Sequence, residues 1–317
     1  MEKCLISVVI PIFNEAENIP LLHYRLIEVL NKIRQDYEII YVDDGSTDQT
    51  PNVLRKLYDE DCHVKVIRFR RNFGQSSALY AGFEHAKGEI IVTIDADLQN
   101  NPEDIPHLLQ KLDEGFDVVC GWRKKRQDSL AKKIPSRIFN WIVQRTFGID
   151  IHDASCTLRA YRKEAIENLE IYGEMHRYIP ALIAWKGFRV AEIEVQHNPR
   201  KHGKTKYNFT RLVKGFLDLL TVKFFTSYLA RPAHILGLFG ILLLIAGIIT
   251  GSYLVVIKLL YAMPIADRPL LLLSVLLNIL GIQMISIGLI SEIMSRIFYS
   301  VKQAKPYSIS EILEHKT

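Results

Sequence analysis

Residues 88–99 read Gly-Glu-Ile-Ile-Val-Thr-Ile-Asp-Ala-Asp-Leu-Gln, and this stretch decides the fold. A short apolar, β-branched run that ends at carboxylates is typical of a strand buried on both faces of a parallel sheet. The carboxyl ends of such strands face the ligand crevice. Asp95 and Asp97 flank a single alanine, so both carboxylates can reach one hard cation. The stretch therefore predicts a strand with a magnesium or manganese site, Asp95 and Asp97, at its end.

Similar runs and helical patterns alternate on either side of this stretch. The expected strands are residues 5–13, 37–42, 64–69, 89–94 and 116–121. The expected helices are residues 16–33, 74–86, 102–113 and 130–147. An edge strand at 158–161 and a later strand at 188–195 complete the pattern. The alternation predicts an α/β domain with a mostly parallel sheet covered on both faces.

Two uncharged apolar stretches, residues 235–257 and 269–291, follow this domain. Each reaches the ~20 residues that cross a bilayer as a helix. Buried helices of a soluble core are the alternative, which we disfavour because two such runs seldom occur together in soluble folds. Residues 207–229 place apolar side chains at helical spacing with cations on the other side. We expect amphipathic helices in the membrane interface there, with ordinary packing on the domain as the alternative.

We therefore expect four segments: a catalytic domain at 1–206, juxtamembrane helices at 207–232, a transmembrane hairpin at 233–296 and a tail at 297–317. Lysine and arginine gather before the first span and after the second, which predicts an integral membrane protein with two spans and both termini cytoplasmic. The net charge of +5 is too mild to argue for a nucleic-acid partner. The four cysteines lack metal or disulfide spacing, as in a reducing cytoplasm. Self-association through the spans stays open.

Three motifs occur in order: Val-Val-Ile-Pro-Ile-Phe-Asn-Glu at 8–15, Val-Asp-Asp-Gly-Ser-Thr-Asp at 42–48 and Asp-Ala-Asp-Leu-Gln at 95–99. In this order and spacing they resemble the motifs of family 2 glycosyltransferases of the GT-A fold. The resemblance extends through Gly-Trp-Arg at 121–123, Asp153 and Arg159 to the two spans. That fuller match is to polyprenyl-phosphate sugar transferases, namely dolichyl-phosphate mannose synthase and the bactoprenol glucosyltransferases. The two-span tail is most similar to the second group.

The resemblance implies a role for each matching residue. The nucleotide-sugar donor would contact Pro11, Asn14, Glu15, Asp43, Asp44, Asp95 and Gln99. Asp97, Asp153 and Arg123 would be catalytic, and Asp95 and Asp97 would hold Mg²⁺ or Mn²⁺. For the Asn14-Glu15 step a helix N-terminus is an alternative that can hold at the same time, and for Asp153 the alternative is a salt bridge to a neighbouring arginine. Cys156, Thr157 and Leu158 replace the family's usual Ser-Gly-Phe, so the local turn departs from the pattern.

A lipid phosphate as acceptor needs charge compensation more than it needs a base. The second pKa of a phosphate monoester is about 6, so the group is largely dianionic near neutral pH and already nucleophilic. The site must then supply positioning and positive charge, and arginine forks suit phosphate better than lysine. The candidates for binding the acceptor phosphate are Arg123, Arg137, Arg159, Arg200, Lys204 and Lys206.

The resemblance implies transfer of a hexose to polyprenyl phosphate with inversion, with glucose from UDP-glucose as the first expectation and mannose from GDP-mannose as the second. A processive polysaccharide synthase is disfavoured because Gln-x-x-Arg-Trp is absent. A nucleotide-sugar-binding membrane scaffold without turnover is disfavoured by Asp95 and Asp97. A dinucleotide oxidoreductase is set aside because no Gly-x-Gly-x-x-Gly follows the first strand.

Overall fold

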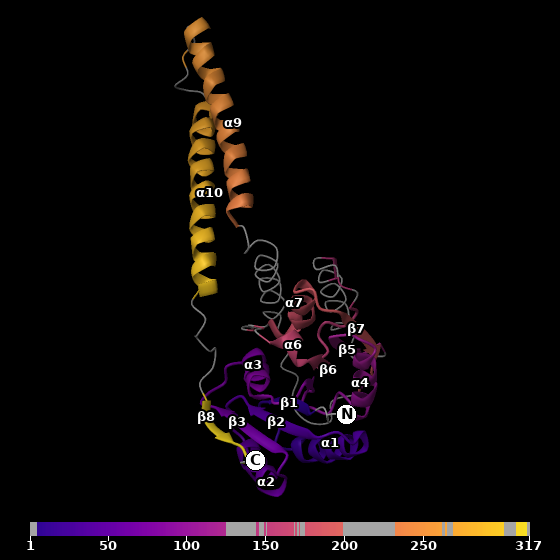
Figure 1. The fold of residues 1–317 in the computed structure, drawn as a ribbon. Helices are drawn as coiled ribbons and strands as arrows, with labels where there is room; N and C mark the ends of the chain where they lie inside the picture. Colours follow the sequence, from indigo (N-terminus) through magenta and orange to yellow (C-terminus); the bar gives the residue numbers. More distant parts are fainter. Residues whose placement is uncertain are drawn as a thin grey trace. The chain divides into compact units, whose positions relative to one another are not determined.

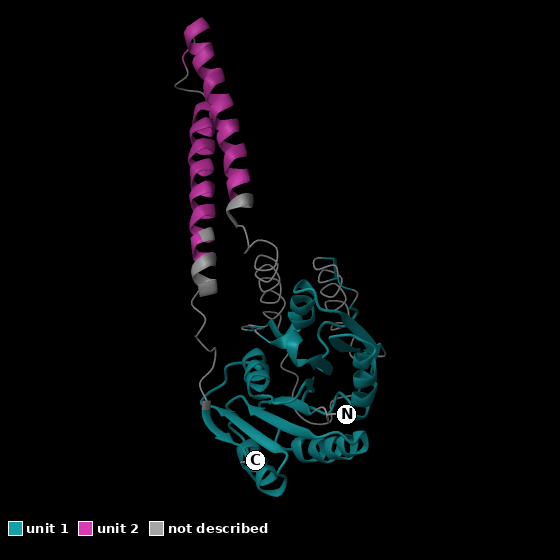
Figure 2. Ribbon diagram, in the orientation of Figure 1, with its two compact units in different colours: residues 1–222, 305–317 teal, residues 223–304 magenta. Residues whose placement is uncertain are grey.

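The computed structural model describes residues 5–124, 144–145, 149, 151–167, 169, 171, 175–198, 232–261, 264, 269–300 and 309–315 (Figure 1). The chain divides into two compact units (Figure 2), residues 1–222 with 305–317 and residues 223–304. We call the first the sheet domain and the second the helix hairpin. The helices expected at 130–147 and 207–229 lie outside the described residues, except for residues 144–145, which are helical.

An eight-stranded sheet organises the sheet domain, in the order β7-β5-β6-β4-β1-β2-β3-β8. The strands are β1 Ile6–Ile12, β2 Tyr37–Asp43, β3 Val64–Phe69, β4 Ile90–Thr93, β5 Val118–Trp122, β6 Arg159–Arg162, β7 Val190–Glu194 and β8 Ile309–Leu313. Among these strands only β6 and β8 run antiparallel to their neighbours. The mostly parallel α/β sheet predicted from the sequence is confirmed, and the carboxyl ends of β1, β2, β4 and β5 share one edge.

Helices cover both faces of the sheet. They are α1 Ile19–Ile33, α2 Thr50–Glu60, α3 Gln75–His85, the 3-10 turn η1 Pro102–Asp104, α4 Ile105–Asp113, α6 Lys163–Ile166, the 3-10 turn η2 Met175–Tyr178 and α7 Ile179–Trp185. Every residue of β1 is buried because its side chains alternate between two cores. Val8 packs in the core that includes α1, α2 and α4, and Val9 packs in the one that includes α3 and α7. A Cβ at Gly82 of α3 would lie 2.2 Å from Val9 Cγ1, so this small residue lets α3 approach the sheet.

The strand expected at the edge of the sheet lies inside it. β6 pairs with β4 on one side and with β5 on the other, and β7 forms the edge instead. Arg159, a charged residue at the start of β6, is only 2% exposed. Its Nη1 and Nη2 donate to the carbonyls of His176 (3.1 Å) and Ala154 (2.6 Å), whereas its buried Nε has no partner among the described residues. A charged residue can therefore begin an interior strand.

The tail returns to the sheet domain as β8, a strand that the sequence did not predict. β8 pairs antiparallel with β3 and covers that edge of the sheet. Glu314, just after β8, accepts ion pairs from Lys65 (3.2 Å) and Lys87 (2.7 Å). The His315 ring stacks on Tyr58 with 4.2 Å between ring centroids. Thus residues 309–315 belong to the sheet domain rather than to a separate tail.

The helix hairpin consists of α9 Pro232–Tyr261 and α10 Pro269–Ser300. Both helices hold stretches long and apolar enough to cross a membrane, Leu236–Tyr261 and Pro269–Ser291, with mean hydropathies of 2.4 and 2.3. The two helices pack closely, because a Cβ at Gly240 would lie 2.7 Å from the Gly281 carbonyl oxygen. The Ser274 hydroxyl also donates to the Gly247 carbonyl oxygen at 2.8 Å, which adds a polar link between the two helices.

Candidate active site

The loops that follow β1 and β2 are bonded to each other. The Asn14 backbone, with φ of 57°, donates to the Ser46 hydroxyl (2.9 Å), and the Asn14 side chain accepts from the Thr47 backbone (2.8 Å). The Glu15 backbone donates to the Thr50 hydroxyl at 3.0 Å. The first two motifs thus form one unit at the edge where the strands end. Pro11 is buried in β1 beneath it, whereas Asn14 is exposed.

Asp43 and Asp44 accept hydrogen bonds from different loops at this edge of the sheet. Asp43 is fully buried, accepts from the Ser46 backbone (2.8 Å) and lies 3.4 Å from Arg68 Nε. Asp44 accepts from the backbones of Phe73 (2.6 Å) and Gly74 (2.9 Å). Burial raises the pKa of Asp44, and these two N–H donors oppose that rise. Asp44 therefore orders the loop after β3, and Asp43 orders its own turn.

Gly45, between Ser46 and Asp44, occupies a position that excludes a side chain. Its φ is +70°, in the left-handed region that favours glycine. A Cβ there would also lie 2.5 Å from the backbone carbonyl carbon of Arg71. The glycine lets the loop after β2 approach the loop after β3, which brings both loops to the same side of the sheet edge.

The third motif, just after β4, presents three half-buried polar side chains in alternation: Asp95, Asp97 and Gln99. Leu98 takes a φ of 61°, an uncommon conformation for a bulky residue and a sign of a constrained turn. Burial, together with the neighbouring charge of Asp97, raises the pKa of Asp95 to about 6. Two carboxylates that repel each other in this way suit a divalent cation, which prefers oxygen ligands.

Two neighbours hold the Asp95 carboxylate in place. Gln75, the first residue of α3, donates to one oxygen at 2.9 Å, and the Thr157 hydroxyl donates to the other at 2.5 Å. Asn100 in turn donates to the Thr157 hydroxyl at 3.2 Å. The sequence did not single out Gln75, and it marked Thr157 only as a departure from the family pattern.

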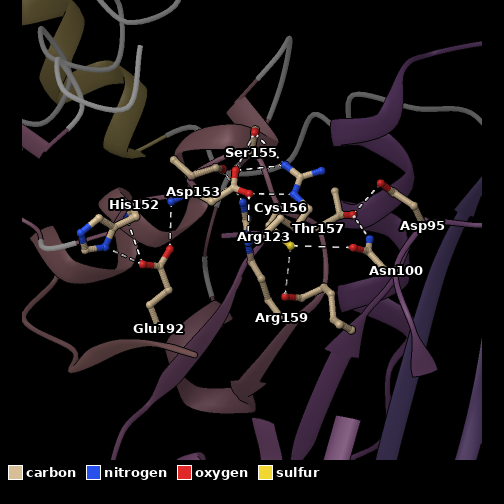
Figure 3. A network of polar contacts seen from close by, with 12 residues as sticks. Asp95, Asn100, Arg123, His152, Asp153, Ser155, Cys156, Thr157, Arg159 and Glu192 are labelled. Carbon is tan, nitrogen blue, oxygen red and sulfur yellow. Dashed lines mark hydrogen bonds and ion pairs between the residues drawn. The ribbon is translucent and has the colours of Figure 1, made fainter. Parts of the chain in front are cut away.

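Arg123, the residue after β5, forms a two-pronged salt bridge with Asp153 (Figure 3). Nε lies 2.7 Å from one carboxylate oxygen of Asp153 and Nη2 lies 3.0 Å from the other. The side chains are only 11% and 4% exposed. Ser155 accepts from Nη2 at 2.9 Å and donates to Asp153 at 2.8 Å, which closes a triangle. The salt bridge weighed as the alternative role of Asp153 is thus present.

The guanidinium of Arg123 keeps its charge and one open side. Burial works against the charged form, but the charge and hydrogen bonds of Asp153, together with the charges of other neighbours such as Asp95, outweigh it and raise the pKa of Arg123. Nη1 makes no hydrogen bond to any residue that the structure describes, so its two N–H groups can meet an incoming anion. The charges of Arg123 and Asp95 also act on each other, since each favours ionisation of the other. A guanidinium with unused N–H donors thus adjoins the carboxylate pair.

One short segment, residues 153–157, joins these two groups. Asp153 and Ser155 contact Arg123, and Thr157 contacts Asp95 (Figure 3). Arg159 supports the segment from below through the Ala154 carbonyl. Because Arg159 is buried and bonded to backbone carbonyls, it is not placed to bind a lipid phosphate, and we correct that prediction. The other predicted acceptor residues, Arg137, Arg200, Lys204 and Lys206, lie outside the described residues.

Comparison with known proteins shows which family the chain resembles. The profile of the family described as "Glycosyl transferase family 2" matches residues 7–170. A dodecaprenyl-phosphate galacturonate synthase of Rhizobium johnstonii is 37% identical over 98% of this chain and 94% of its own. An undecaprenyl-phosphate 4-deoxy-4-formamido-L-arabinose transferase of Salmonella choleraesuis is 39% identical over 97% of this chain and 93% of its own.

A solved structure supports the fold alone. Glucosyl-3-phosphoglycerate synthase from Mycobacterium tuberculosis, in complex with Mn²⁺, uridine diphosphate and phosphoglyceric acid, superposes with a TM-score of 0.55. The match covers 71% of this chain and 79% of that chain at 19% identity. At this identity the likeness concerns the arrangement of strands and helices.

Proposed function

The chain belongs to glycosyl transferase family 2, and from this membership we propose that it transfers a sugar from a nucleotide diphosphate to a polyprenyl phosphate. One observation carries the proposal: the carboxylates of Asp95 and Asp97 adjoin the Arg123–Asp153 pair through residues 153–157. A nucleoside diphosphate leaving group and a phosphate acceptor need this combination. A cation held by carboxylates neutralises the leaving group, and a guanidinium binds the acceptor phosphate.

Asp95 and Asp97 would hold the cation on the donor side. Their residue types fit Mg²⁺ or Mn²⁺, because both are oxygen donors and their mutual repulsion is relieved by a dication. When bound, the ion would neutralise the nucleoside diphosphate as its bond to the sugar breaks. Gln75 and Thr157 keep the Asp95 carboxylate fixed before the donor arrives. In the same proposal the linked loops of Asn14 and Asp44 form the nucleotide pocket.

Arg123 would receive the acceptor on its open side. A lipid phosphate that is already dianionic attacks the sugar directly, with inversion, and needs no strong base. The task of the protein is then to orient the phosphate and offset its charge as it approaches the donor. Asp153 fixes the fork of Arg123 so that Nη1 points away from the pair. On this reading Asp153 acts mainly by orienting Arg123.

The donor sugar is the finer part of the proposal. The resemblance of the two-span tail favoured glucose from UDP-glucose, with mannose from GDP-mannose second. Relatives matched along almost their whole length are instead named for galacturonate and for 4-deoxy-4-formamido-L-arabinose. We therefore propose that the donor carries a modified sugar of one of these two classes, and that glucose is the less favoured donor. Each has a polar substituent that glucose lacks, so a panel of donors separates them.

The helix hairpin would anchor the enzyme where its acceptor lies. Two apolar helices of membrane-spanning length follow the sheet domain, and the cationic residues around them favour a cytoplasmic sheet domain. Anchoring restricts the search for a lipid phosphate to a surface, which raises its effective concentration.

The test is a transfer assay with the full-length protein in vesicles that contain undecaprenyl phosphate. The donors are radiolabelled UDP-glucose, UDP-galacturonate, UDP-4-deoxy-4-formamido-L-arabinose and GDP-mannose, each with Mg²⁺ or with chelator. We expect one donor to give a lipid-extractable product that chelator and Asp97→Ala abolish. Asp113→Ala, at an exposed carboxylate that ends α4, is the matched control and should transfer normally. If no donor labels the lipid while UDP still binds, the protein is a nucleotide-binding scaffold and the proposal fails.

A further inference from the structure

Asp153 lies in a segment that no regular secondary structure holds. Residues 151–158 form neither helix nor strand. Even so, the Asp153 carboxylate meets Arg123 in a two-pronged bridge that tolerates little displacement. A backbone shift of this segment would open that bridge, so something outside it must set the position of Asp153.

Glu192 of β7 supplies that support. Its Oε1 accepts from the Asp153 backbone at 2.9 Å. Its Oε2 accepts from the His152 backbone at 2.9 Å and lies 3.0 Å from His152 Nδ1. The Glu192 side chain is 6% exposed. One buried carboxylate therefore accepts from the consecutive backbone N–H groups of His152 and Asp153, next to the side chain that holds Arg123 (Figure 3).

The strand that carries Glu192 is tied to the strand that leads into Arg123. β7 pairs in parallel with β5, and Glu192 is the register partner of Cys120. The His152 ring also stacks on Trp122, the last residue of β5, with 4.4 Å between centroids and 20° between planes. Strand β5 leads directly into Arg123, and β7 holds Asp153 through Glu192. The paired strands β5 and β7 thus position both residues of the Arg123–Asp153 bridge.

We propose that Glu192 is a positioning residue for sugar transfer, which holds Asp153 and thereby the open side of Arg123 in the geometry that receives the acceptor phosphate. This inference rests on the proposed function. It adds a residue that touches neither donor nor acceptor. Because Glu192 acts on the acceptor side, its removal should weaken the use of the acceptor lipid and leave nucleotide binding unchanged.

The first measurement does not depend on activity. Hydrogen–deuterium exchange of the full-length protein in nanodiscs is compared for wild type, Glu192→Ala and Glu194→Ala. Glu194 lies two residues along the same strand, is exposed and pairs with Lys124, so it is the matched control. We expect faster exchange across residues 152–153 in Glu192→Ala alone. Unchanged exchange there would overturn the proposal, whether or not the protein transfers sugar.

The second measurement is steady-state transfer in vesicles with undecaprenyl phosphate, using the donor found active. For Glu192→Ala we expect kcat/KM for the lipid to fall about 10- to 100-fold, the size expected for a misplaced positioning group. The KM for the donor and the affinity for UDP with Mn²⁺ should stay within about twofold. Glu192→Gln keeps one acceptor oxygen and should fall between Ala and wild type.

A double-variant cycle separates positioning from general structural support. In an Asp153→Asn background, Glu192→Ala should lower the remaining transfer rate by less than about twofold, because the two residues act through one bridge. Multiplicative losses would overturn the proposal. So would a parallel loss of UDP binding in Glu192→Ala. If wild type transfers no sugar to the lipid, the proposed function fails, and the exchange result alone then decides whether Glu192 holds Asp153.

Discussion

Thr157 offers the sharpest perturbation of the carboxylate pair. Its hydroxyl donates to Asp95 at 2.5 Å, and Thr157→Val removes that donor while keeping the shape of the side chain. A hydrogen bond to a charged group contributes about 1.5–3 kcal/mol. At about 1.4 kcal/mol for each factor of ten, Mn²⁺ should bind about 10- to 100-fold more weakly in the presence of UDP. Thr157→Ser keeps the hydroxyl and should bind as wild type does.

The same change predicts a pH dependence with a definite sign. The pKa of Asp95 is raised to about 6, and the Thr157 hydrogen bond opposes that rise. Without the bond the pKa rises further, so protons compete better for the carboxylate that holds the ion. The deficit of Thr157→Val should therefore be larger at pH 6.5 than at pH 8.5. Isothermal titration of Mn²⁺ into the UDP-bound protein measures both, and equal affinities of the valine and serine variants at both pH values would refute the reasoning.

Two further predictions concern stability, both read from thermal unfolding of the full-length protein in detergent. Gly247→Leu should lower the Tm of the helix hairpin, because a Cβ there would lie 2.5 Å from Asn278 Nδ2, whereas at Gly237 nothing lies within 4 Å and Gly237→Leu should change little. Glu314→Gln should lower the Tm of the sheet domain by about 2–4 °C, the effect of about 1 kcal/mol. Hydrogen bonds from Lys87 and Lys65 lower the pKa of Glu314 below its usual 4.5, so its contribution is present above that pH and is lost as the pH falls further. A deficit that persisted at pH 3.5 would contradict this account.

The sheet could be predicted because its strands are buried on both faces. Such strands read as unbroken apolar runs, and their carboxyl ends led to the prediction of a metal site at Asp95 and Asp97. Strand β8 was not predicted from the sequence because it lacks such an apolar run. Its sequence, Ile-Ser-Glu-Ile-Leu, is short and polar at two positions, as suits an edge strand, and its partner β3 lies far away in the chain. No local pattern shows that a segment after two membrane-length helices returns to the sheet.

The residues of the candidate site differ in the same way in how far the sequence predicts them. Arg123 follows a strand that is visible in the sequence, and the family resemblance made it a candidate for the acceptor phosphate, which stays a prediction. Arg159 was predicted as a phosphate ligand because it is an arginine next to a motif that differs from the family pattern. Its two backbone carbonyl partners come from a loop and from η2, and the sequence does not show that these segments meet. Glu192 carries only the alternating polarity of an edge strand. Its partner, the irregular segment 151–158, cannot be placed by periodicity.

The bridge between Arg123 and Asp153 explains how a cationic site can exist before its ligand arrives. A buried guanidinium without a partner would be strongly destabilising, so the acceptor site cannot be an unpaired arginine. A carboxylate partner solves this, but it must not consume every donor. Here Asp153 accepts from Nε and Nη2, Ser155 accepts from Nη2, and Nη1 is left for the phosphate that we propose as acceptor. A lysine, with one point charge and no fork, could not divide its donors in this directed way. The residue types at this site therefore follow from the need to keep a charge buried, paired and still able to bind an anion.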